Sequence, residues 1–291
     1  MKKITIFTPT YNRAYILGQA YESLKRQTNK NFIWLIIDDG STDATEKLVN
    51  NWKNEKIIEI DYIKKKNGGK HTAYNMALEN VRTELILLCL DSDDYLVENA
   101  VERLLNEWEK NKNKRIKGIV ALCDSKDLNK AYCKKYIDKE LKYCSLNQAL
   151  VNEYFDSEAI FLVDSQYAQK FKYPEFNDEK FFTEAYILYQ MTENFFWLKE
   201  SLCIREYRND GLTKNIMKIF AENPKSWFLY NRLRLKVSKK VHLKYAIYYI
   251  AFGLLAKEKE ILKKSPKRII TFFVYPLGII GYFYIKKNKG N

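Results

Sequence analysis

The sequence predicts an α/β protein in which helices flank a mostly parallel β-sheet. Short apolar runs alternate with segments of helical periodicity in residues 1–110, which is typical of strand–helix–strand units. Each apolar run in this part ends in polar or glycine-rich sequence. Parallel sheets bind ligands in the crevice outside the carboxyl ends of their strands. The polar sequences after the apolar runs therefore predict one shared pocket.

The first two strands are predicted from short apolar segments. Residues 4–7 form such a run before the turn sequence TPT, and residues 14–27 carry apolar side chains at helical spacing. The uninterrupted run 32–37 suits a strand that is buried on both faces. It ends in DDGSTD, where Thr42 or Asp43 can cap a second helix.

Two further strands follow in the same pattern. Residues 57–63 predict a third strand, and NGGKH leads from it into a helix over 72–80. Residues 85–90 predict a fourth strand that ends in DSDD, before a helix over 100–110. Four strand ends therefore carry TPTYNR, DDGSTD, NGGKH and DSDD, and we expect them to meet at one edge of the sheet.

The rest of the chain divides into a less regular part and a basic part. Strands and short helices are expected over 118–122, 146–152, 159–163 and 181–191. Since no Gly/Ser or Pro-rich linker interrupts the sequence, we expect one catalytic domain over 1–215. Residues 216–291 are predicted to form a basic, aromatic-rich helical extension.

The composition indicates a folded protein of a reducing compartment. Hydrophobic residues make up 46% of the chain and aromatic residues 15%, enough for a core. The five cysteines are widely spaced without a CxxC pair, which argues against a disulfide framework or a zinc site. The N-terminal sequence MKKITIFTPTYNR lacks the features of a secretory signal, so we expect an intracellular protein.

The DSDD sequence is the strongest candidate for a metal site. Carboxylates one residue apart at a strand end can converge on one Mg²⁺ or Mn²⁺ ion, which keeps positions for water and substrate phosphate. Such an ion would stabilise the charge of a departing nucleotide diphosphate. The alternative is a solvated turn, with Asp94 as a helix cap.

The other strand ends offer groups that suit a nucleotide. Asp39 can accept a hydrogen bond from a pyrimidine base or a ribose, and Tyr11 can stack on the base. Gly69 and Lys70 at a helix start offer N–H groups and positive charge to phosphate. Taken singly, each sequence also fits an ordinary turn or loop, and His71 fits a structural role.

Four motifs in order and spacing carry a resemblance: ITIFTPTYNR, LIIDDGSTD, NGGKHTAYNMAL and LLCLDSDDYL. With them the chain resembles the bacterial family 2 glycosyltransferases over about residues 3–215, most strongly over the first 110. The resemblance implies the Rossmann-like GT-A fold, a nucleotide-sugar donor, and Mn²⁺ or Mg²⁺ at a DXD motif.

The resemblance also implies roles for individual residues. The position of Asp39 binds uracil in that family, and those of Pro9 and Tyr11 line the base pocket. Asp91 and Asp93 match the pair that contacts ribose and metal, so we predict Asp93 and Asp91 as the metal ligands. The predicted nucleotide-sugar site comprises Pro9, Tyr11, Arg13, Asp39, Gly69, Lys70, Asp91, Ser92, Arg205 and Arg208.

Inverting transfer needs a general base on the side of the sugar opposite the leaving group. The family draws this base from an acidic motif in its second half, where this chain reads YPEFNDEKFFTEAYI. The adjacent Glu-Asp pair of the family is replaced here by Asp178-Glu179. We predict Glu179 as the base, then Asp178, then Glu184, and a surface carboxylate is the alternative for each.

Positive charge is concentrated near the C-terminus. The formal net charge is +14, and residues 225–291 hold 16 Lys and Arg against two Glu. Such a segment predicts a polyanionic partner. The apolar stretches 245–256 and 269–285 favour an anionic membrane surface, and no nucleic-acid module is recognisable.

The stretch 269–285 is too short for the roughly 20 residues of a spanning helix and contains Pro276. An interfacial element lying on anionic lipid fits it better. The alternative is that both apolar stretches are helices packed on the catalytic domain. We therefore expect a cytoplasmic protein, peripherally associated with the inner face of the cell membrane.

These features predict an inverting, metal-dependent glycosyltransferase with a UDP-sugar donor. Its acceptor would be lipid-linked or a polysaccharide, in cell-surface glycan assembly such as capsule, lipopolysaccharide or teichoic-acid decoration. A nucleotidyltransferase is one alternative, although it would carry a glycine-rich loop where this chain has TPTYNR. A catalytically inactive membrane-bound scaffold with the same fold is another, and the sequence is compatible with an oligomer.

Overall fold

The computed structural model describes residues 2–125, 135–136, 142–156, 158–206, 216–238 and 243–287. The chain forms two compact units. The first comprises Met1–Lys172 with Met191–Tyr207, and the second Tyr173–Gln190 with Arg208–Asn291. Residues 173–190, which lie within the expected catalytic domain, thus belong to the same compact unit as the C-terminal helices.

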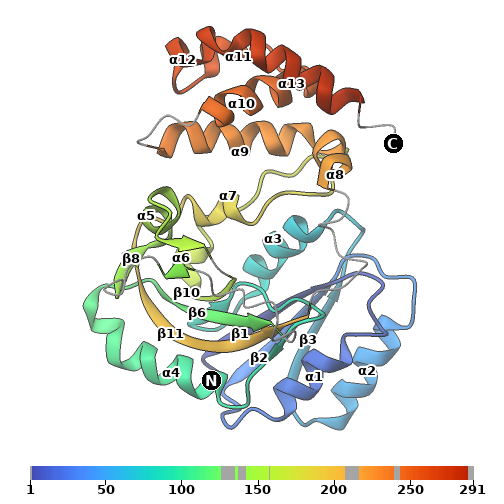
Figure 1. Cartoon of the computed structure of the whole chain (residues 1–291). Coiled ribbons are helices and arrows are strands. Elements are labelled where there is room, and N and C mark those ends of the chain that lie inside the picture. Colours follow the sequence, from blue (N-terminus) through green and yellow to red (C-terminus); the bar gives the residue numbers. More distant parts are fainter. Residues whose placement is uncertain are drawn as a thin grey trace. The chain divides into compact units, whose positions relative to one another are not determined.

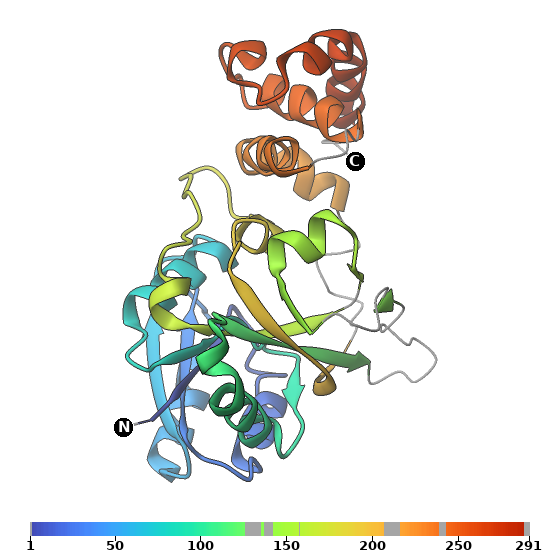
Figure 2. The ribbon, with the colours of Figure 1, turned by 90° about the vertical axis from the view of Figure 1, so that its left-hand side faces the viewer.

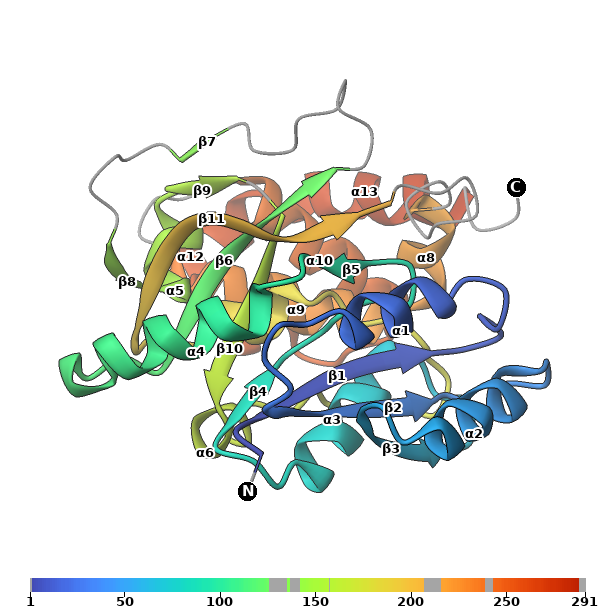
Figure 3. The same ribbon diagram turned by 90° about the horizontal axis from the view of Figure 1, so that it is seen from below.

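The first unit is built on a sheet that has nine strands within the described residues. Four neighbouring strands are parallel in the order β3–β2–β1–β4, and their bounds are Ile4–Thr10 (β1), Phe32–Asp38 (β2), Glu59–Lys64 (β3) and Leu85–Leu87 (β4). Figure 3 shows β1, β2 and β3 pointing in the same direction. Their carboxyl ends therefore lie at one edge of the sheet, as expected.

The other half of the sheet is mixed. It continues as β10–β6–β11–β5, with bounds Ala159–Asp164 (β10), Gly118–Ser125 (β6), Asn194–Arg205 (β11) and Tyr95–Leu96 (β5), and Tyr143–Ser145 (β8) pairs with β11. Strand β10 is antiparallel to both β4 and β6, whereas β6 and β11 are parallel. The predicted α/β class is confirmed, with more antiparallel pairing than the sequence predicted.

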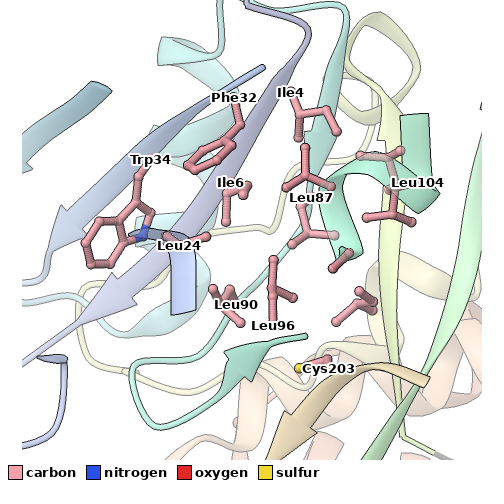
Figure 4. Close-up of a cluster of buried hydrophobic side chains, with 14 of the residues drawn as sticks. Ile4, Ile6, Leu24, Phe32, Trp34, Leu87, Leu90, Leu96, Leu104 and Cys203 are labelled. Atoms are coloured by element: carbon pink, nitrogen blue, oxygen red, sulfur yellow. The ribbon is translucent and has the colours of Figure 1, made fainter. Parts of the chain in front are cut away.

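Helices cover both faces of this sheet, as Figures 1 and 3 show. One face carries α1 (Gly18–Lys25), α2 (Thr45–Glu55) and α4 (Ala100–Asn111), and the other carries α3 (Lys70–Asn80). Alternate residues of the strands face the first group of helices. Figure 4 shows the resulting core, in which Ile4, Ile6, Phe32, Trp34 and Leu87 lie with Leu24 and Leu104.

The remaining described elements of the first unit are short. They are η1 (Lys112–Lys114), α5 (Leu146–Val151), α6 (Ser165–Ala168) and a ribbon of β7 (Lys135–Tyr136) with β9 (Phe155–Asp156). The strand expected over 85–90 ends at Leu87. Beyond it the Leu88 N–H donates to Phe161 O at 3.0 Å and the Leu90 N–H to Phe7 O at 2.8 Å, so the chain stays beside its neighbours outside a regular ladder.

The second unit is helical. Its described helices are α7 (Ala185–Leu188), α8 (Ile216–Glu222), α9 (Pro224–Val237), α10 (Leu243–Leu255), α11 (Ile261–Lys264), α12 (Arg268–Phe273) and α13 (Tyr275–Lys287). The helix expected over 181–191 is thus only the short α7. Helix α10 packs between α9 and α13, drawn in orange to red in Figure 2.

The apolar stretch 269–285 forms two helices that meet at Val274. Gly278 lets α13 approach α10 closely, because a Cβ atom there would lie 2.4 Å from Ile250 Cγ2. Within the described residues, no helix combines the length and the hydrophobicity that crossing a bilayer requires.

Candidate functional site

The ends of β1 and β2 are joined by hydrogen bonds between their loops. The Asn12 N–H donates to Ser41 Oγ at 2.8 Å, and the Thr42 N–H donates to Asn12 Oδ1 at 2.8 Å. Asp43 accepts from the N–H groups of Ala14 and Thr45, both at 3.0 Å. These bonds fix the loop that carries two predicted site residues, Tyr11 and Arg13, just beyond Pro9 in β1.

Tyr11 and Arg13 present their side chains differently. The Tyr11 ring is 48% exposed, so one face of it is accessible to a base. Arg13 lies against Tyr15, with its guanidinium carbon 5.8 Å from the ring centroid. Burial raises the pKa of Asp93, and the positive charge of Arg13 opposes this rise. Arg13 therefore lies near the aspartate cluster.

Asp39 holds the glycine-rich loop. Its buried carboxylate accepts hydrogen bonds from Gly68 N at 2.9 Å, Gly69 N at 2.7 Å, Lys65 Nζ at 2.8 Å and Asn67 Nδ2 at 3.1 Å. Gly69 has a φ of +96°, a conformation that favours glycine. Both Asp39 oxygens are occupied, so contact with a nucleotide base requires one of these donors to move.

Lys65 and Asn67, which bond to Asp39, were not among the predicted site residues. They follow β3, and the register of β2 with β3 places Asp38 opposite Lys64. The residues just beyond the two strand ends are therefore adjacent. The available signal was that the polar sequence after the third strand begins before NGGKH.

Lys70 and Asp91 form an ion pair. Lys70 Nζ lies 2.5 Å from Asp91 Oδ1, and the Cys89 thiol lies 3.2 Å from the same oxygen. Burial raises the pKa of Asp91, but attraction to Lys70 and Arg205 outweighs it and holds the pKa at about 2. A negative charge and a positive charge thus stand together at the start of α3, where the helix N-terminus also favours anions.

Asp94 and Arg205 form a second, more buried pair. Arg205 Nε lies 3.2 Å from Asp94 Oδ2, and the same guanidinium bonds to Glu158. Burial raises the pKa of Asp94, which Arg205 offsets in part. Asp94 thus pairs with Arg205 rather than capping α4, which begins at Ala100. Arg205 was predicted to contact phosphate. In this structure its guanidinium is paired with Asp94 and Glu158.

Two other predicted residues remain in this region. Ser92 is buried beside the cluster, and His71 is buried in α3. Arg208 lies outside the described residues.

Asp91 and Asp93 suit a divalent cation that a diphosphate would also coordinate. Burial and the charge of Asp91 raise the pKa of Asp93, so the two carboxylates repel each other. A cation between them would relieve this repulsion and complete its shell with water and phosphate oxygens. Among the described residues, no group of three or more His, Cys, Asp or Glu is placed to hold a metal ion unaided.

The three predicted general bases belong to the second unit. Both Glu179 oxygens accept hydrogen bonds at the start of α9, from Lys225 N at 2.6 Å, Ser226 N at 2.8 Å and Ser226 Oγ at 2.6 Å. Asp178 is exposed, and its carboxylate pairs with Lys225 Nζ at 2.6 Å. Glu184 is exposed at the start of α7. The structure therefore gives Glu179 a helix-capping role.

The family is decided by the sequence of the first unit. Residues 5–171 match the glycosyl transferase family 2 model, which is more than half of the 291 residues. The chain belongs to glycosyltransferase family 2. The predicted family is thereby confirmed.

Relatives of this glycosyltransferase match it over part of its length. An uncharacterised glycosyltransferase of Rickettsia felis is 40% identical over 109 residues, 38% of this chain and 18% of that protein. The teichoic acid poly(glycerol phosphate) polymerase of Staphylococcus epidermidis is 34% identical over 113 residues, 37% of this chain and 15% of the polymerase. The match thus spans less than a fifth of each of these relatives.

Solved glycosyltransferase structures share the fold. Residues 1–349 of Staphylococcus aureus TarS, in complex with UDP-GlcNAc, superpose with a TM-score of 0.64 at 17% identity, over 98% of this chain and 90% of that chain. A mannosyltransferase of Pyrobaculum calidifontis, in complex with GDP-Man and Mn²⁺, gives a TM-score of 0.57 at 11% identity, over 98% and 75%. The expected GT-A-type fold is therefore confirmed.

Proposed function

We propose that this glycosyltransferase is an inverting, metal-dependent enzyme that takes a sugar from a UDP-sugar. The main supporting observation is the arrangement of Gly69, Lys70, Asp91 and Asp93 at the carboxyl edge of the parallel strands. The N-terminus of α3, a cation and two carboxylates together match the needs of a metal-bound nucleotide diphosphate. The TarS complex with UDP-GlcNAc supports UDP as the nucleotide.

The Lys70–Asp91 pair gives the site a way to accept its donor. With a diphosphate present, Lys70 would turn to the phosphate oxygens, and Asp91 would be released to share a cation with Asp93. The bound Mn²⁺ or Mg²⁺ would supply electrostatic stabilisation of the leaving UDP. Tyr11 and Pro9 would flank the base, and Ser92, Arg205 and Arg208 complete the proposed site.

The general base is proposed among the same three carboxylates, in a revised order. Glu179 has its oxygens occupied at the start of α9. Asp178, although paired with Lys225, and Glu184 are exposed, so an acceptor hydroxyl can reach them more easily than the buried Glu179. We place Asp178 first, Glu184 second and Glu179 third.

The proposed acceptor is a lipid-linked or polysaccharide chain in bacterial cell-surface glycan synthesis. The relatives include a teichoic acid polymerase and the poly(ribitol-phosphate) β-N-acetylglucosaminyltransferase TarP of Staphylococcus aureus, 33% identical over 120 residues. TarP is matched over 36% of its length, so its acceptor supports the class of reaction rather than a particular polymer. The place of action proposed for the chain is the inner face of the cell membrane.

UDP release from a panel of UDP-sugars, with and without Mn²⁺, tests the proposal. Asp93→Asn is expected to lower kcat/KM by about 100-fold or more, because it removes a metal ligand that stabilises the leaving group. Asp61→Asn is the matched control, because Asp61 lies within β3 and its carboxylate pairs with Arg82. Absence of turnover and of UDP binding with every donor would refute the proposal.

The same assays distinguish the two alternative functions. Release of pyrophosphate from UTP and a sugar phosphate would favour a nucleotidyltransferase. UDP binding without turnover would favour an inactive scaffold.

A further inference from the structure

The second unit exposes an apolar face on α12 and α13. Six of its large side chains have between 61% and 75% of their surface exposed, namely Ile269, Phe272, Phe273, Ile280, Phe283 and Tyr284. Most soluble proteins expose such residues singly, and a contiguous group indicates a binding surface. Lysine and arginine side chains stand at both ends of the face, at Lys267, Arg268, Lys286 and Lys287.

A cationic pocket of about 770 Å³ lies within the same unit. Its lining includes five basic residues and one acidic residue, which are Arg232, Lys236, Lys263, Lys264, Arg268 and Glu260. Such an excess of positive charge in a concave surface favours a ligand with negative charge.

Much of this positive charge is not neutralised by the protein. Lys263 pairs with Glu260 at 2.9 Å and Lys264 with Glu258 at 2.5 Å, but Arg232, Lys236 and Arg268 form no ion pair with any described residue. Arg232 Nε donates to Lys264 O at 3.2 Å, and Arg268 Nε donates to Lys263 O at 3.1 Å. Backbone contacts therefore orient two guanidinium groups, which can bind the oxygens of a phosphate in bidentate fashion.

The pocket and the apolar face meet on α12. Arg268 lines the pocket, and Ile269, the next residue, is 75% exposed on the apolar face. A membrane phospholipid has the same combination of groups, since its charged phosphate is joined to apolar chains. Free phosphate has no apolar chains, so it would bind to the pocket and leave the apolar face uncovered.

We propose that α12 and α13 lie in the interface of an anionic membrane and that the pocket binds the phosphate headgroup of an anionic phospholipid. The apolar side chains enter the boundary between headgroups and acyl chains, and Arg232, Lys236 and Arg268 hold one headgroup beside them. This inference names the partner of the second unit and does not depend on the identity of the sugar donor.

Vesicle flotation of the full chain tests the inference. Vesicles of phosphatidylcholine alone are compared with vesicles that also contain phosphatidylglycerol. The pocket variant R232Q/K236Q/R268Q is expected to bind phosphatidylglycerol vesicles roughly 100-fold more weakly, since each basic residue near the surface contributes about fivefold. The variant F272S/F273S should lose binding because its exposed rings no longer enter the interface.

The matched control is K47Q/K53Q/K56Q, which removes the same charge from exposed positions of the first unit. It should bind vesicles nearly as wild type does. If both triple variants lost vesicle binding equally, the pocket would be overturned as the headgroup site. Binding would then depend only on the overall charge of the protein.

Other outcomes exclude other occupants of the surface. Binding of inorganic phosphate to the protein at constant ionic strength, without binding of wild type to phosphatidylglycerol vesicles, would overturn the lipid as the ligand. A dimer in sedimentation that F272S/F273S dissociates, without vesicle binding by wild type, would assign the apolar face to a second copy of the chain. UDP release is measured for the same variants without vesicles, so that failure of membrane binding is distinguished from failure of the proposed transfer reaction.

Discussion

The substitution Glu179→Gln is expected to destabilise the second unit by about 2–4 kcal/mol. The Glu179 carboxylate accepts two backbone N–H groups and one hydroxyl at the start of α9. Glutamine keeps one acceptor oxygen but presents an NH₂ group to the remaining donors. The estimate takes about 1–2 kcal/mol for each of two buried donors left without an acceptor, one of the present donors and the new NH₂ group.

Urea unfolding measures this change, followed by the fluorescence of Trp227, which lies next to Ser226 in α9. Glu222→Gln replaces an exposed carboxylate of the same unit and should change the free energy of unfolding by less than about 0.5 kcal/mol. UDP release is then measured at temperatures where both variants are folded. A loss of activity of about 1000-fold with unchanged unfolding would refute the capping role and identify Glu179 as the base.

The pH dependence of stability provides an independent measurement on the same residue. Burial raises the pKa of Glu179 above 4.5, with hydrogen bonds from Ser226 and Lys225 opposing this shift. The folded state then binds the proton more tightly than the unfolded chain does. The free energy of unfolding should therefore fall as the pH rises from about 4.5 through the folded pKa, and Glu179→Gln should lose this contribution.

Three further substitutions probe other parts of the molecule. Arg205→Met leaves the buried Asp94 carboxylate without its cation and should cost about 3–5 kcal/mol in urea unfolding, so a change below 1 kcal/mol would contradict the pairing. Gly278→Ala places a Cβ atom against Ile250 and should lower the stability of the second unit by about 1–3 kcal/mol, an effect that Ile250→Val should partly relieve. Lys70→Met should raise the KM for a UDP-sugar by about tenfold or more with little loss of stability, and an unchanged KM would exclude Lys70 from phosphate binding.

Local sequence patterns were sufficient to predict the first half of the fold. The apolar runs of β1 and β2 and the helical spacing of α2 and α4 depend on neighbours in the sequence, and these elements form close to their predicted bounds. Strand β11 was not predicted, because its sequence NFFWLKESLCIR interrupts the apolar run with polar residues. Its pairing with β6 contains register shifts, which local periodicity does not reveal.

The candidate site was predicted as a set of strand ends, but its internal contacts were not. The bonds from the 65–69 segment to Asp39 depend on the register of β2 with β3. Glu179 caps a helix that begins 45 residues later in the chain, at Pro224, so no local capping pattern marks it. Long-range pairing decides both features, and local sequence patterns do not reveal it.

The aspartates of the first unit differ in how their charge is balanced, and this difference supports a division of roles. Asp39 is held by four donors and Asp94 by Arg205, so both stabilise the loops around the site. Asp91 is balanced by Lys70, a flexible side chain that can move to a phosphate. Burial and repulsion by Asp91 outweigh the attraction of nearby cations at Asp93, since its pKa is raised. An added divalent cation would relieve this repulsion at Asp93, which no described ion pair neutralises, and this imbalance supports its proposed role as a metal ligand.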